Sequence, residues 1–188
     1  MKKMPTVFVR DFGTGPHYVT DQVTPGCEWV LAGEGIATRK YDGTCCMLDE
    51  QGRWWARREI KPGREQPPYF VALDHDEVTG KTMGWEPIGY SSFAKYHAEA
   101  LATGTPTDGV PGTYELVGER INGNPEHYAG HDLVRHADAE LLAFSDRSYA
   151  EMRRILTFLR EKYGYEGVVF KHPDGRMAKL KAKDFPAE

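Results

Sequence analysis

Cysteine is scarce in this chain of 188 residues, which has three: Cys27, Cys45 and Cys46. Three thiols, two of them adjacent, exclude a disulfide framework, and their spacing does not match a structural zinc site. The sequence also lacks an apolar run of roughly 18 residues, the length of a membrane-spanning helix, and it lacks a signal-peptide pattern. We therefore expect a soluble, cytoplasmic protein with no membrane association.

An excess of positive charge is missing as well. The formal net charge is −4, so the chain has no uniformly basic surface, and any nucleic-acid binding must use local patches. Hydrophobic residues make up 40% of the chain, a share typical of folded domains and too high for a disordered one. The basic residues gather in two segments: Arg53, Arg57, Arg58, Lys61 and Arg64, then Lys171, Arg176, Lys179, Lys181 and Lys183.

Strand-like segments outnumber helical ones. Residues 44–60 predict a β-hairpin around the turn DEQG, and residues 166–182 predict a second around PDG. Residues 149–163 show helical periodicity, with Ser148 and Glu151 forming a capping-box pattern at the start. This order predicts an α+β fold with antiparallel sheets, a few helices and one domain over residues 1–188.

Three further segments carry structural expectations. Residues 28–43 predict a strand, a Gly-rich bend and a second strand, and residues 91–104 predict a short helix. Residues 61–92 are rich in Pro and Gly, and we expect them to form a long irregular insertion.

Lys40 stands in the sequence KYDG. Because a lysine has a pKa near 10.4, roughly one in 2,500 is neutral and nucleophilic at pH 7. Burial or neighbouring cations lower such a pKa, and a bend at Asp42 and Gly43 would aim the side chain. The same residues also fit an ordinary tight turn, so this segment alone leaves both interpretations open.

The C-terminal lysines alternate along a predicted strand. Lys179, Lys181 and Lys183 should share one face, with Leu180 on the other. Like charges on one face repel one another. They indicate either a solvated edge strand protected by lysines or a platform for phosphate groups.

Carboxylates occur within or beside two other predicted strands. Alternation places Glu115 on the same face as Val117, with Glu119 at the end of that strand, and Glu166 on the same face as Val168. Each could be an exposed strand residue, or it could bind a ribose hydroxyl or a divalent cation near phosphates.

The order Lys, Glu, Glu, Lys-x-Lys resembles the covalent nucleotidyltransferase superfamily of ATP-dependent ligases and capping enzymes. KYDG is similar to motif I, TYELVG to motif III, EGVVF to motif IV and KLK to motif V. The chain most resembles small cellular RNA ligases related to the vertebrate 5′–3′ RNA ligase, through KYDGTCC, ARREIKPG, TGKTMGW, INGNPE and GRMAKLKAKDF. The resemblance runs from about residue 5 to 185 and implies an ATP-grasp-like ligase adenylation (nucleotidyltransferase) domain.

The resemblance implies a role for each motif residue. Lys40 would be adenylated by ATP, Glu166 would serve Mg²⁺ or Mn²⁺, and Glu115 would bind the ribose. Nucleotide binding would involve Asp42, Gly43, Arg57, Glu115, Glu166, Lys179 and Lys181, the last two at the α-phosphate. Arg57 and Lys61 would contact the RNA 5′-phosphate, and the further candidates are Glu119, Lys171 and His136, the last in the strand expected to supply an adenine-stacking ring.

Two departures refine the resemblance. Cys45 stands where DNA ligases carry an arginine, which argues against a DNA ligase. Only seven residues follow Lys181, so we expect no OB-fold, and RNA binding would come from this domain or from a protein partner.

The expected function is an ATP-dependent RNA ligase that acts in RNA repair and joins a 5′-phosphate to a 3′-hydroxyl. The alternatives are transfer to another acceptor, as in capping or protein AMP transfer, and a non-catalytic module that binds nucleotide or RNA ends.

Overall fold

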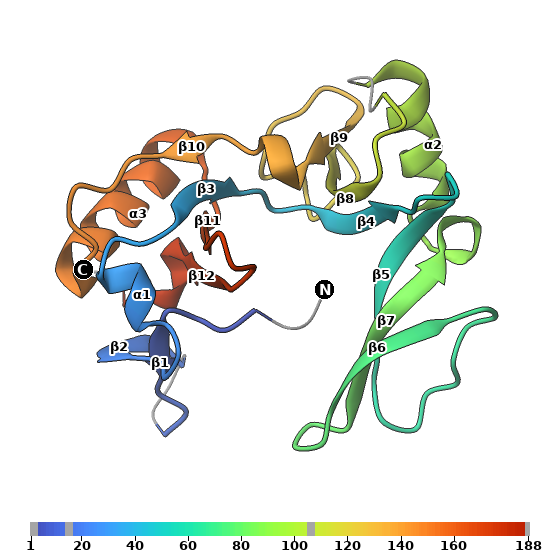
Figure 1. Ribbon diagram of the computed structural model, residues 1–188. Helices are drawn as coiled ribbons and strands as arrows, with labels where there is room; N and C mark the ends of the chain where they lie inside the picture. Colours follow the sequence, from blue (N-terminus) through green and yellow to red (C-terminus); the bar gives the residue numbers. More distant parts are fainter. Residues whose placement is uncertain (1–3, 14–16, 105–107, 187–188) are drawn as a thin grey trace. The chain divides into compact units, whose positions relative to one another are not determined.

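The computed structural model describes residues 4–13, 17–104 and 108–186. It confirms the predicted α+β class, with antiparallel sheets and three α-helices among the described residues (Figure 1). The chain divides into two compact units, and each is described by itself. The central unit is Asp42–Asp138, and the terminal unit combines Met4–Tyr41 with Ala139–Glu188. The single domain expected over residues 1–188 stays a prediction.

The terminal unit is built on a four-stranded sheet with the order β10-β3-β11-β12. All its strand pairs are antiparallel, and Thr6 extends the β12 edge through a parallel bridge to Lys179. The other elements are a two-stranded sheet and two helices. The bounds are β1 (Phe8–Arg10), β2 (Val19–Val23), α1 (Glu28–Leu31), β3 (Ile36–Lys40), β10 (Leu141–Leu142), α3 (Tyr149–Tyr163), β11 (Gly167–Lys171) and β12 (Met177–Lys181).

Helix α3 confirms the prediction over residues 149–163. Ser148 Oγ accepts a hydrogen bond from the Glu151 amide at 3.4 Å, and Gly164 ends the helix in the left-handed conformation with φ 72°. In a complete capping box, the Glu151 side chain would also accept from the Ser148 amide. This part of the prediction is wrong, because the Glu151 carboxylate accepts from Arg154 instead.

One face of the four-stranded sheet forms the core of the terminal unit. Val168, Phe170 and Leu180 are fully buried and belong to the same cluster as Met152 and Leu156 of α3. Alternation sends the remaining strand residues to the other face, and these include Lys40, Lys179 and Lys181. The predicted segregation of Leu180 from Lys179 and Lys181 is therefore confirmed.

The central unit has a six-stranded antiparallel sheet with the order β6-β7-β5-β4-β8-β9. Its core contains Cys46, Tyr114, Leu116 and Leu133, together with Ala100 from α2. The bounds are β4 (Thr44–Leu48), β5 (Trp54–Ile60), β6 (Val71–Asp76), β7 (Lys81–Pro87), α2 (Ala94–Thr103), β8 (Gly112–Gly118) and β9 (His131–Arg135). The hairpin predicted over residues 44–60 and the helix predicted over 91–104 are confirmed.

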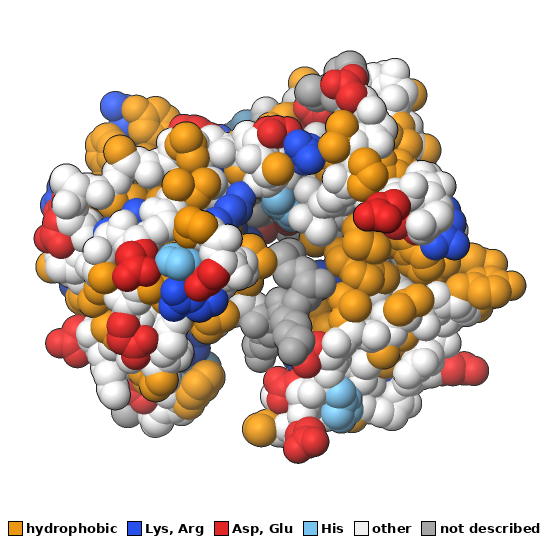
Figure 2. All heavy atoms as spheres, viewed as in Figure 1, with side chains coloured by type: hydrophobic (Ala, Val, Ile, Leu, Met, Phe, Trp, Pro, Cys, Tyr) orange, Lys and Arg blue, Asp and Glu red, His pale blue; other side chains and the backbone are white. Residues whose placement is uncertain are grey.

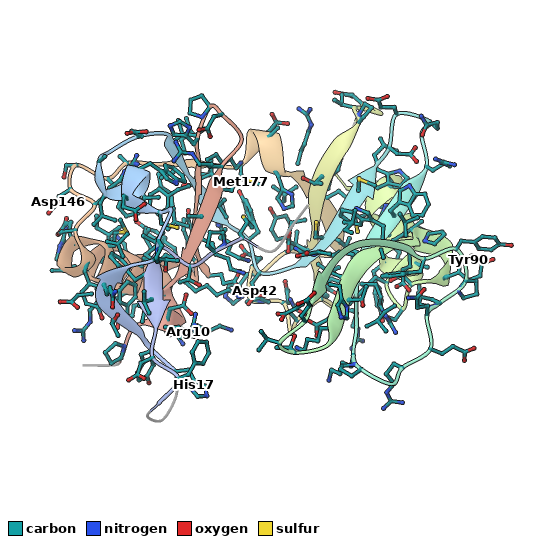
Figure 3. The ribbon with its side chains drawn as sticks, turned by 60° about the horizontal axis from the view of Figure 1, so that its bottom comes forward. Arg10, His17, Asp42, Tyr90, Asp146 and Met177 are labelled. Carbon is teal, nitrogen blue, oxygen red and sulfur yellow. The ribbon has the colours of Figure 1, made fainter. Side chains whose placement is uncertain are left out.

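The expected irregular insertion over residues 61–92 is wrong, because β6 and β7 form a hairpin there. Gly84 was expected in a loop, but it lies inside β7 and permits close packing there. A Cβ at this position would collide with the Phe70 ring and the Val71 carbonyl. This edge of the sheet exposes apolar groups, and the Tyr69 and Tyr90 rings lie 5.7 Å apart. Figure 2 shows such apolar side chains on the surface, and Tyr90 projects outward in Figure 3.

Two other expectations are corrected. Glu28–Leu31 form helix α1, where a strand was expected, because Trp29 and Val30 are both buried in one turn of helix. Lys183 lies in the 3₁₀ turn Ala182–Asp184, where the Asp184 carboxylate accepts from the Lys181 amide and β12 ends. Lys183 therefore does not extend the lysine row, which consists of Lys179 and Lys181 on one face of β12. Among the described residues, no helix is both long and apolar enough to cross a membrane.

Leu156→Ala should lower the free energy of unfolding by about 2–5 kcal/mol, because it leaves a cavity between α3 and the sheet. The matched control is Phe158→Ala on the same helix, where the side chain is half exposed and the cost should stay within about 0.5 kcal/mol. Urea unfolding followed by circular dichroism measures both. Equal losses in the two variants would contradict this packing.

Candidate functional site

Strand register in the terminal unit brings Lys40 and Lys181 to either side of Gly167. Gly167 pairs with Lys40 across β3 and with Lys181 across β12. Directly opposed residues in antiparallel strands project to the same face, so both lysines lie on the face away from the core. Gly167 also has a steric role, because a Cβ there would collide with the Leu180 carbonyl oxygen.

Glu166 precedes β11 and joins the two lysines. Its Oε2 accepts from Lys40 Nζ, and its Oε1 accepts from Lys181 Nζ. The Glu166 side chain is only 7% exposed, and the lysine side chains are 18% and 23% exposed. The expectation that Glu166 shares a face with Val168 is wrong, because Glu166 lies before the strand and strand alternation does not reach it.

The electrostatics of this carboxylate follow from its surroundings. Burial alone would raise the pKa of Glu166, but the charges and hydrogen bonds of Lys40 and Lys181 outweigh burial and hold that pKa below its ordinary value. A carboxylate bonded to an ammonium group favours the charged form, which is not nucleophilic. A nucleophilic role for Lys40 would therefore require its contact with Glu166 to open.

Lys179 and Lys171 lie at different distances from the cluster formed by Lys40, Glu166 and Lys181. Lys179 pairs with Val169, two residues along β12 from Lys181 and on the same face. Lys171 lies at the far end of β11, about 13 Å from Gly167 along the strand. The geometry thus places Lys179 beside the cluster and separates Lys171 from it.

A divalent cation at Glu166 was expected from the resemblance. A carboxylate is the ligand type that Mg²⁺ and Mn²⁺ prefer. Both oxygens of Glu166 are taken by ammonium groups, however, so this arrangement does not fit a cation at Glu166. The metal role of Glu166 stays a prediction.

In the central unit, Asp42 and Gly43 form a turn held by the segment 121–126. Asn122 Nδ2 donates to Asp42 Oδ1 at 3.0 Å and to the Gly43 carbonyl at 2.9 Å. Glu126 Oε1 accepts from the Asp42 amide at 2.8 Å. Asn122 and Glu126 both lie in the quoted segment INGNPE, but their bonds to this turn were not predicted.

Glu115 lies in β8 opposite Cys45 of β4. Its Oε1 accepts from the Gly43 amide at 3.2 Å, and its Oε2 lies 2.9 Å from His136 Nε2. Glu115 and His136, both predicted, are therefore brought together. Glu119 is not: its side chain is exposed and accepts from the Gly130 amide at 3.2 Å.

The two predicted RNA contacts lie on and beyond β5. Arg57 pairs with Trp85, and its Nε is buried without a hydrogen-bond partner among the described residues. Lys61 directly follows the strand and is exposed. A buried guanidinium N–H that lacks an acceptor is suited to an incoming anionic oxygen.

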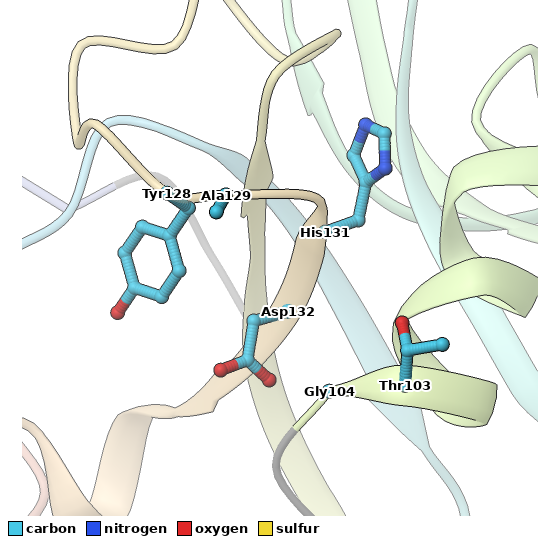
Figure 4. Close-up of a pocket in the computed structure, with 6 residues that line it drawn as sticks. All are labelled: Thr103, Gly104, Tyr128, Ala129, His131 and Asp132. Atoms are coloured by element: carbon cyan, nitrogen blue, oxygen red, sulfur yellow. The ribbon is translucent and has the colours of Figure 1, made fainter.

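A pocket of about 430 Å³ lies elsewhere in the central unit (Figure 4). None of the predicted site residues lines it. The lining residues are Thr103, Gly104, Tyr128, Ala129, His131 and Asp132. Its His131 has Nδ1 2.8 Å from the Glu99 carboxylate and its ring stacked on Tyr96, contacts typical of a structural histidine.

Comparison with known proteins leaves these assignments unchanged. No protein-family model matches the chain, and no curated protein matches it. The roles considered for each residue rest on the quoted motifs and on the contacts described above.

Gly43→Ala should lower the free energy of unfolding by about 1–3 kcal/mol, because the new Cβ would collide with the Leu116 carbonyl and crowd the Glu115 side chain. Gly89→Ala is the matched control, since a Cβ at Gly89 meets nothing within 4 Å. Thermal unfolding compares the two variants. A Gly43 variant as stable as the Gly89 variant would refute the close approach of this turn to β8.

Glu166→Gln should cost about 3 kcal/mol near neutral pH, because it leaves two partly buried ammonium groups without their carboxylate. A carboxyl whose pKa is lowered by folding stabilises the protein above its unfolded pKa of about 4.3, and this stability disappears as pH falls through the folded value. The difference between wild type and variant should therefore shrink in acid. Urea unfolding at roughly pH 7 and roughly pH 3.5 measures it, with Glu161→Gln on the exposed side of α3 as the control. A difference that is independent of pH would contradict the ion pairs.

Proposed function

We propose that this chain is an ATP-dependent RNA ligase that forms a covalent lysyl-AMP intermediate at Lys40. The observation that carries the proposal is the arrangement of Lys40 and Lys181 around Glu166 at the ends of three adjacent strands. An ordinary surface turn or a solvated lysine edge would not require a largely buried carboxylate shared by two lysines.

The first chemical step is nucleotidyl transfer. The Lys40 ammonium group loses one proton to solvent, its Nζ forms a bond to the α-phosphorus of ATP, and a second proton leaves Nζ for solvent as the P–N bond forms. The bond from that phosphorus to the bridging oxygen breaks at the same time, and pyrophosphate leaves. Because the pKa of Glu166 is below its ordinary value, Glu166 is a weak base, and its role is to position Lys40 and Lys181.

The lysine row supplies the charge that this step needs. An α-phosphate drawn to Lys181 and Lys179 would compete with Glu166 for the ammonium groups and neutralise the charge that develops on the phosphate. Substrate binding would thereby loosen the ion pairs that hold Lys40 in its resting form. Positioned cations and a positioned nucleophile together account for most of the catalysis in phosphoryl transfer.

Two further steps would complete ligation. The oxygen of an RNA 5′-phosphate attacks the phosphorus of lysyl-AMP, the P–N bond breaks, Lys40 takes up a proton from solvent, and an RNA–adenylate forms. The 3′-hydroxyl of a second RNA end then attacks the 5′-phosphorus and loses its proton to solvent, the bond from that phosphorus to AMP breaks, and a phosphodiester remains. Arg57 is the candidate for the 5′-phosphate, because its buried Nε lacks an acceptor among the described residues, and Glu115 is the candidate for the ATP ribose.

Lys40→Ala and Lys40→Arg should both abolish covalent labelling by α-labelled ATP with Mg²⁺ or Mn²⁺, because neither side chain offers the amine at this position. Lys181→Ala should label at least ten-fold more slowly, since it removes one cation from the row. Denaturing gels and intact mass measure the adduct, and Lys183→Ala, exposed and outside the row, serves as the control.

Labelling that persists in both Lys40 variants would refute the proposal. Labelling by GTP in preference to ATP would favour a capping-type reaction, and an adenylated chain that never transfers AMP to 5′-phosphorylated RNA would favour another acceptor. Retention of ATP without any adduct would identify a binding module.

A further inference from the structure

Three metal-ligating side chains meet in the central unit: Cys45, Glu115 and His136. Their ligand atoms, a thiol sulfur, a carboxylate oxygen and an imidazole nitrogen, all lie within 4.8 Å of one another. Cys45 and Glu115 are opposed across β4 and β8, and His136 directly follows β9, the next strand of the sheet. Three adjacent strands therefore fix the positions of the three ligands.

These residue types select one class of metal. A thiolate with an imidazole and a carboxylate suits Zn²⁺ and is a poor set for Mg²⁺, which takes oxygen ligands. Tetrahedral Zn²⁺ with ordinary bond lengths separates its ligand atoms by about 3.5 Å. The Glu115–His136 contact of 2.9 Å is shorter than this value and would need to open slightly, and Cys45 Sγ lies within 4.8 Å of both other ligand atoms.

The surrounding contacts orient the ligands as outer-shell groups do in zinc sites. His136 Nδ1 lies 2.9 Å from Thr113 Oγ1, so a proton on Nδ1 would leave Nε2 as the ligand. The Gly43 amide donates to Glu115 Oε1 and leaves Oε2 on the side of His136. The Glu115 side chain is 12% exposed and that of His136 is 27% exposed, which leaves an approach for an ion from solvent.

We propose that Cys45, Glu115 and His136 bind a Zn²⁺ ion, with solvent or a ligand oxygen in the fourth position. Binding replaces the Cys45 thiol proton by the metal–sulfur bond and releases that proton to solvent. Zn²⁺ binding here does not require the proposed ligase activity, although Glu115 is also the candidate for the ATP ribose; neither Lys40 nor Glu166 belongs to the site. It is distinct from a catalytic Mg²⁺ or Mn²⁺, which has no preference for a thiolate.

Titration of the protein of 188 residues with Co²⁺ tests the proposal. We expect one equivalent to bind, with thiolate-to-cobalt charge transfer and the visible bands of four-coordinate Co²⁺, and Zn²⁺ should displace it. Cys45→Ser and His136→Ala should each abolish the charge-transfer band or weaken binding more than ten-fold. Thr113→Val should weaken binding by about 10–100-fold through the orientation of His136.

The matched controls remove a thiol and a histidine outside the cluster. Cys27→Ala, in the terminal unit, and His127→Ala, exposed in the central unit, should keep the full signal. Circular dichroism establishes that each variant is folded. Absence of a charge-transfer band in the folded wild type would overturn the proposal, as would a band that survives both Cys45→Ser and His136→Ala. Adenylation measured on the same samples decides the ligase proposal separately.

Discussion

The shared carboxylate of Glu166 is the constraint on which the terminal unit's functional face depends. The ammonium groups of Lys40 and Lys181 repel each other, and burying the Glu166 carboxylate without partners would cost free energy. The two ion pairs offset both the repulsion and the cost of burial. The arrangement needs the register that puts Gly167 between Lys40 and Lys181, and it needs a residue without a side chain there. The sheet, the glycine and the ion pairs therefore specify one another.

Glu115 has a comparable position in the central unit. It is a carboxylate with little exposure, here within strand β8, and an amide and an imidazole hold its two oxygens. The segment KYDG belongs to both units: Lys40 ends β3 of the terminal unit, and Asp42 and Gly43 belong to the central unit. Each half of this motif is thus fixed by its own unit, Lys40 by Glu166 and the Asp-Gly turn by Asn122.

Periodicity and turn residues were enough to predict the elements with local signals. In helix α3 the periodic apolar residues, the N-terminal cap Ser148 and the C-terminal Gly164 all lie close together in the sequence. The hairpin of β4 and β5 has a clear polar turn. The hairpin of β6 and β7 was missed because many of its residues are exposed on both faces and Gly84 imitates a loop. In the site, the motif residues could be predicted, but their partners could not. The contacts of Glu166 with Lys40 and of Gly43 with Asn122 span 126 and 79 residues, and no local pattern encodes them.

The ligase proposal and the zinc proposal both use Glu115. They can be tested separately, because they need different neighbours of this carboxylate. The resemblance implies that Glu115 binds the ATP ribose, whereas the zinc proposal makes it a metal ligand together with Cys45 and His136. A ribose hydroxyl requires only the carboxylate, but zinc requires the thiolate as well. Replacing Cys45 by serine leaves Glu115 in place and removes the softer ligand. If both proposals are correct, zinc and nucleotide would compete for Glu115, and the serine variant would keep nucleotide binding while losing its sensitivity to zinc.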